Sequence, residues 1–147
     1  LGDARGAQAA AGRAVEALEA AEPSSGDDPV WIKHFDEAYL ADELAHCHRD
    51  LGQAEAAARQ AEESLAKHPR SRARRRAIGY VLLATAQVQQ REVEQACHTG
   101  LKAVELLGSL RSNRGADYLE DFQQRLEPFR EEAVVREFGA RMDLQAA

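Results

Sequence analysis

The chain has 147 residues, of which 44% are hydrophobic and 5% aromatic, and its formal net charge is −6. This length fits one domain, and the hydrophobic fraction excludes a generally disordered chain. The negative charge gives the molecule as a whole no attraction to nucleic acid, so we expect no direct nucleic-acid contact. No stretch approaches the roughly 20 apolar residues of a membrane helix, and we expect no membrane insertion.

Two cysteines, Cys47 and Cys97, bear on where the protein works. They are too few for a disulfide framework, so we expect free, partly buried thiols and a cytoplasmic location. The first residue is Leu1 and the only methionine is Met142. We therefore expect the chain to be a piece of a longer protein, from its C-terminal part.

Seven segments carry apolar or small residues at three- and four-residue spacings, the pattern of an amphipathic helix. Turns rich in glycine, proline and serine separate most of them, and no alternating strand pattern stands out. In chain order the predicted helices are 4–21, 31–51, 54–67, 72–90, 92–107, 114–126 and 131–141. In the second of these, one stripe predicts the packing face: Leu40, Leu44, Cys47 and Leu51, with Ala41, Ala45 and His48 beside it.

The helices come in pairs, which is a reason to look for an internal repeat. Small residues at i, i+4 and i+7 followed by an aliphatic residue occur three times, starting at Ala10, Ala57 and Ala96. Small side chains on one face let a second helix approach closely. The pattern therefore predicts stacked helix pairs.

These residues resemble the tetratricopeptide repeat, a 34-residue helix pair. Residues 38–71 match its small-residue, turn and terminal positions at Ala45, Gly52, Ala57, Ser64 and Pro69. Residues 77–110 match at Ala84, Ala96 and Ala103, but Arg91 stands in place of the turn glycine and the final proline is missing.

The resemblance implies an all-α fold of antiparallel helix pairs, stacked as a short right-handed superhelix of about seven helices. It implies one domain over 1–147. Its parts are a half-repeat helix in 1–22, repeats in 31–69 and 72–108, and C-terminal capping helices in 112–147.

A narrower resemblance covers residues 31–52, WIKHFDEAYLADELAHCHRDLG, residues 72–84, and the tail around Ser112, Arg114, Leu119 and Leu126. These segments look like the C-terminal repeat domain of actinobacterial helix-turn-helix transcriptional regulators. In that family a DNA-binding module precedes the repeats. The resemblance implies a regulatory domain that binds a protein, a peptide or a small effector.

One stripe of the second predicted helix is the expected binding surface, because the first helix of each tetratricopeptide pair lines a concave groove. We call it the concave stripe: Trp31, Phe35, Tyr39, Asp42, His46 and Arg49. The next repeat places Ile78, Val81 and Thr85 at the corresponding positions. We expect a ligand, another protomer or the C-terminal helices to cover this apolar wall. Alternatively to lining a groove, Trp31 and Phe35 pack under the first predicted helix.

A basic stretch, 67–76, holds six of the nineteen basic residues and no acid. It opens a predicted helix, where the helix dipole disfavours cations, so a compensating anion is expected. Arg72, Arg75 and Arg76 form a candidate anion-binding face, and a solvated face paired with acids such as Glu62 and Glu63 is the alternative.

The sequence contains no motif for catalysis or metal binding. His46, Cys47 and His48 are consecutive, so on a helix they point about 100° apart and cannot converge on one ion. No Gly-rich phosphate loop, GxSxG, HExxH or CxxC occurs. We expect no enzyme, cofactor or metal, but a partner- or effector-binding domain of a transcriptional regulator. The alternative is a structural domain that forms a homodimer or scaffold without a small ligand, through the C-terminal helix pair.

Overall fold

The computed structural model describes residues 30–108 and 113–146, and this part of the chain is helical with no strand. Its six α-helices are α2 (Val30–Asp50), α3 (Ala54–Lys67), α4 (Ala73–Gln89), α5 (Val93–Gly108), α6 (Asn113–Leu126) and α7 (Ala133–Ala146), with the 3-10 turn η2 (Glu127–Phe129) before α7. The all-helical class is thus confirmed for the described residues. The predicted helix 4–21 lies outside them, and α7 extends five residues beyond its predicted end at 141.

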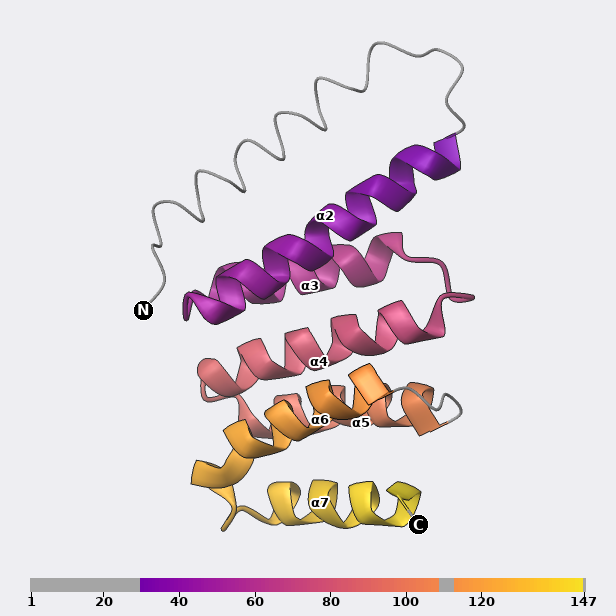
Figure 1. The fold of residues 1–147 in the computed structure, drawn as a ribbon. Helices are drawn as coiled ribbons and strands as arrows, with labels where there is room; N and C mark the ends of the chain where they lie inside the picture. The colour runs from indigo at the N-terminus through magenta and orange to yellow at the C-terminus, as the bar shows by residue number, and fades with distance from the viewer. Residues whose placement is uncertain (1–29, 109–112, 147) are drawn as a thin grey trace.

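The helices form a stack from α2 at one end to α7 at the other, and α6 overlaps α5 in this view (Figure 1). Each of α2, α3 and α4 packs against the helix that follows it. Next-but-one contacts join α2 to α4, α4 to α6 and α5 to α7. As a result α4 lies in the middle of the stack, and its residues 81–88 are all buried.

Two turns in the stack repeat the same backbone geometry 39 residues apart. Gly52 and Arg91 both have positive φ, 71° and 64° respectively. Each donates its N–H to the carbonyl three residues back, at 3.0 and 2.9 Å, and the next residue donates to the carbonyl five residues back, at 2.8 and 2.9 Å. This is the Schellman helix ending, which favours glycine. Arg91 adopts this left-handed backbone conformation although it costs a residue with a side chain about 1–2 kcal/mol.

The packing face of α2 consists of Ala38, Ala41 and Ala45, together with Leu44. The leucine-and-cysteine stripe predicted for this role is wrong at Cys47, which is exposed. Alanine takes the buried positions because it allows the helix axes to approach more closely than leucine does. Ala41 and Ala45, predicted to lie beside the stripe, are more deeply buried than Leu40 and Leu51, which are only half-buried.

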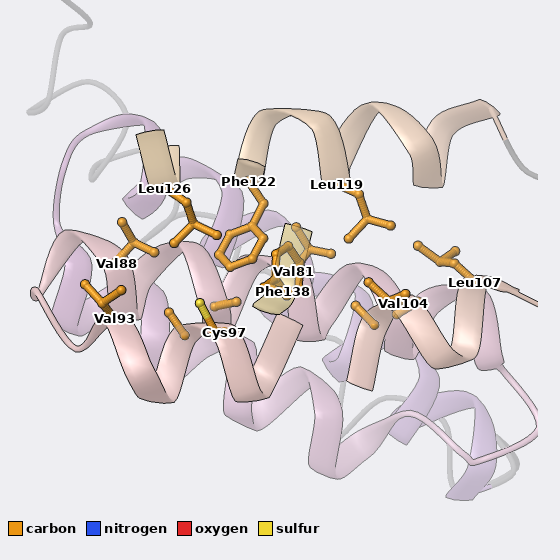
Figure 2. Packing of buried hydrophobic residues seen from close by; sticks show 14 residues of the cluster. Val81, Val88, Val93, Cys97, Val104, Leu107, Leu119, Phe122, Leu126 and Phe138 are labelled. Carbon is orange, nitrogen blue, oxygen red and sulfur yellow. The ribbon is translucent and has the colours of Figure 1, made fainter. Parts of the chain in front are cut away.

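Aromatic residues join the last three helices into the larger core cluster. Figure 2 shows Phe122 pointing from α6 into this cluster, near Phe138 of α7. The two rings meet edge to face, with centroids 5.3 Å apart and planes at 89°. Gly100 of α5 makes room for them, since an added Cβ would lie 2.7 Å from Phe122 Cε1 and 3.0 Å from Phe138 Cε2.

Candidate functional site

The first half of the concave stripe is only partly visible. Trp31 and Phe35 lie within α2, but their side chains are outside the described part of the structure. Tyr39 is half-buried and meets the edge of the His68 ring, with centroids 5.7 Å apart. The guanidinium of Arg75 lies 4.5 Å above the Tyr39 ring, which is a cation–π contact. Tyr39 and Arg75, predicted for two different sites, therefore touch each other.

Asp42 lies inside the protein instead of lining an open surface. One carboxylate oxygen accepts a hydrogen bond from the Ser64 hydroxyl, and the other accepts one from His68 Nε2 at 2.8 Å. All three side chains are buried. A serine, a histidine and an aspartate invite comparison with a catalytic triad. However, the serine bonds to the aspartate and not to the imidazole, and no substrate could reach it. The cluster joins α2 to the end of α3.

The second half of the stripe contacts neighbouring helices. His46 is half-buried, and its Nε2 is 3.0 Å from the Tyr118 hydroxyl, so this contact joins α2 to α6. Helices α2, α4 and α6 run in the same direction, and we call them the parallel set (Figure 1). Burial lowers the pKa of His46 below its usual value, and the nearby Arg49 lowers it further. Arg49 itself pairs with Asp50 at 3.0 Å. His46 therefore favours its neutral form, which suits a hydrogen bond between helices.

The predicted apolar wall of α4 is buried by the protein itself. Ile78, Val81 and Thr85 are each less than 5% exposed. α6 packs against α4, and Tyr118 packs against the cluster that contains Ile78. Of the three predicted coverings for this wall, the C-terminal helices are the one found. These residues stabilise the stack, and a partner could reach them only by displacing α6.

The candidate anion site is largely used within the protein. Arg76 donates from Nη1 to the carbonyl oxygens of Leu65 and His68, at 2.7 and 3.1 Å, and from Nη2 to Tyr80 at 3.3 Å. Carbonyls at a helix C-terminus carry partial negative charge and favour a cation. The end of α3 therefore supplies the compensation expected for cations at the start of α4. Arg72 is exposed.

An open groove lies between α5 and α7, with a volume of about 1380 Å³. Its floor is apolar and combines buried and half-buried side chains: Val93, Cys97, Leu101, Phe129, Val134 and Phe138. Its rim is exposed and polar: Arg91, Glu92, Glu94, Gln95, His98, Lys102, Glu105, Glu132, Glu137 and Arg141. An apolar floor with a polar rim is the usual anatomy of a protein-binding surface. We call this feature the α5–α7 groove.

The chemistry of the groove floor is set by Cys97. Burial raises the pKa of the Cys97 thiol to about 11, and the carboxylate of Glu132 contributes to the increase. A thiol with this pKa is overwhelmingly protonated near neutral pH and behaves as a small apolar group.

We expect the two thiols to differ sharply in reactivity. Cys97 should react with a disulfide reagent near neutral pH at least about 100-fold more slowly in the folded protein than in urea, since its pKa of about 11 lies about two units above an ordinary thiol. Exposed Cys47 should react rapidly in both. The measurement is a thiol titration of Cys47→Ser and Cys97→Ser, each retaining one cysteine. Equal native rates for the two variants would contradict the assignment of Cys97 to a closed floor.

The sequence did not point to this groove. Glu132, which directly precedes α7, belongs to the segment 112–147 that was predicted to cap the array, and Leu101 was assigned no role. The available signal was the apolar set Phe129, Val134 and Phe138 close to a second apolar helix. Nothing in the sequence showed that α5 and α7 would lie alongside each other.

No group of three or more metal-ligating side chains gathers within the described residues. None of the helices resolved in residues 30–108 and 113–146 is long and apolar enough to cross a membrane. In comparisons with known proteins, no family model, no curated protein and no solved structure matches the chain.

Proposed function

We propose that this chain is a non-catalytic helical-repeat domain that binds a protein or peptide partner in the α5–α7 groove. The observation that carries the proposal is the groove itself, with its apolar floor and exposed charged rim. A surface of this kind buries the apolar side of a partner and leaves the rim to select it. Asp42 of the concave stripe and the apolar wall of α4 are buried within the protein, so they are not offered to a partner as the groove is.

We assign the repeats to the tetratricopeptide type, arranged as a short right-handed superhelix in the cytoplasm. Two observations support this assignment. The turn at Gly52 recurs at Arg91 with the same hydrogen bonds, and each helix of the parallel set contacts the next one of that set. In this scheme α6 and α7 cap the array, as terminal helices must in repeat proteins.

The resemblance of residues 31–52 to regulator repeat domains supports a place in a helix-turn-helix transcriptional regulator. Partner binding between α5 and α7 would change the angle between these two helices. A DNA-binding module attached elsewhere in the full protein would respond through its orientation or its oligomeric state.

A peptide-display selection against the purified domain tests the proposed function. We expect enriched peptides that share apolar residues at i, i+3 or i+4, and i+7. Leu101→Arg and Val134→Arg should each weaken their binding at least about tenfold, because either change places a charge on the apolar floor. Ala66→Arg, an exposed site on α3, is the matched control with the same change in charge. Enriched peptides that bind Leu101→Arg and Val134→Arg as tightly as the wild type would refute the proposal.

A dimerisation or scaffold role is the second candidate function. Leu144, near the end of α7, is 78% exposed, and a second copy could cover it. Sedimentation equilibrium over a dilution series, with Leu144→Asp as the variant, separates the two roles. A dimer that Leu144→Asp dissociates supports this candidate, whereas a monomer at all concentrations rules it out.

A further inference from the structure

The charge of the rim indicates what kind of partner the groove accepts. We propose that the α5–α7 groove binds a short amphipathic helix with basic flanks, an inference that rests on the function proposed above.

Five glutamates and only three permanent cations line the groove. The glutamates are Glu92, Glu94, Glu105, Glu132 and Glu137, and none forms an ion pair with any other residue that the structure describes. Of the cations, Lys102 already lies over the Tyr80 ring, at 5.7 Å. Within the described residues the rim carries more carboxylates than cations and none of these carboxylates is ion-paired, which favours a cationic partner.

The negative potential is not confined to the outer rim. The rim residue Glu132 lines the groove together with Cys97, and after burial its carboxylate is the second cause that raises the pKa of that thiol. A charge beside an apolar, partly dehydrated floor interacts more strongly than one in open water. Basic residues flanking an apolar segment would thus be stabilised where that segment docks.

The walls favour a helix over an extended peptide. The α5 wall runs from Val93 to Glu105, about 18 Å at 1.5 Å per residue, which matches roughly three turns of a docked helix. Both walls are helices, so the described groove has no strand edge to pair with a bound backbone. A helix satisfies its own backbone groups and can place apolar residues at i, i+4 and i+7 against Leu101, Phe129 and Val134.

Fluorescence anisotropy with two designed peptides tests the proposal on the intact chain. Both peptides have about 14 residues and the same leucine positions at helical spacing, but one has lysine and the other glutamate on the polar face. We expect the lysine peptide to bind at least about tenfold more tightly at low salt, and this advantage to shrink as salt rises. Equal affinities, or tighter binding of the glutamate peptide, would overturn it.

Two matched double variants separate the groove from the overall charge of −6. Glu94→Lys/Glu137→Lys changes the rim, and Glu55→Lys/Glu62→Lys changes exposed acids on α3 by the same net charge. The rim variant should lose about tenfold in affinity for the lysine peptide, and the α3 variant should lose much less. Equal losses would show attraction to net charge alone and refute the inference. If display selection instead yields acidic peptides that Leu101→Arg blocks, the proposed function stands and the basic partner does not.

Discussion

Asp42→Ala is expected to lower the free energy of unfolding by about 2–6 kcal/mol, because each of two buried groups left unpaired costs about 1–3 kcal/mol. The change removes the acceptor of both the Ser64 hydroxyl and His68 Nε2. Neither group can reach water while α2 and α3 stay packed. Chemical denaturation followed by circular dichroism measures the loss.

Two further variants show whether the hydrogen-bond network is responsible. Glu43→Ala alters the exposed neighbour of Asp42 and should stay within about 0.5 kcal/mol of the wild type. Adding Ser64→Ala to Asp42→Ala should cost less than Ser64→Ala costs alone, since the hydroxyl has then already lost its acceptor. A loss for Asp42→Ala no larger than that for Glu43→Ala would contradict the assigned network.

Phe122→Ala should lower the free energy of unfolding by about 3–5 kcal/mol, the cost of removing a fully buried ring. The ring fills the space beside Gly100 and meets Phe138 edge to face, so its loss loosens α5, α6 and α7 together. Chemical denaturation measures the change. Because Phe138 lines the α5–α7 groove, the affinity of groove-binding peptides should fall as well.

A pair of glycine variants provides the control for this core. Gly100→Ala should destabilise the protein by about 1–3 kcal/mol, since the new methyl group meets the rings of Phe122 and Phe138. Gly139→Ala, on α7, has no heavy atom within 4 Å of the new group and should stabilise the helix by about 0.5–1 kcal/mol. The same sign for both variants would show that the ring positions are not as described.

Local sequence pattern was sufficient to predict the described helices and most of their limits. Gly52 marked one turn through its freedom to adopt positive φ, and Pro69 marked another. The turn at Arg91 was harder, since no residue there advertises a left-handed conformation. The helix limits at 90 and 92 placed a tight turn there, but the left-handed conformation of Arg91 was not predicted.

The candidate site could not be predicted because it depends on which helices become neighbours. Their helix positions assign Val81 and Thr85 to an exposed wall, and only the position of α6 shows that they are buried. From the sequence Asp42 is expected to be a surface acid, and only the fold shows that Ser64 and His68 lie beside it. The α5–α7 groove combines residues about 40 positions apart. Periodicity assigns a residue to a face of its helix, but only packing shows what that face meets.

The contacts between near neighbours in the chain have a consequence for how the molecule unfolds. Most contacts join helices that are adjacent or next but one in the chain, apart from the His46–Tyr118 contact between α2 and α6. This low contact order favours rapid folding. Such arrays open in units from their ends. The α2–α3 hairpin can therefore separate from α4 while the contacts among α5, α6 and α7 persist. The α5–α7 groove would therefore stay able to bind its partner during partial unfolding events in which α2 and α3 become accessible to proteases.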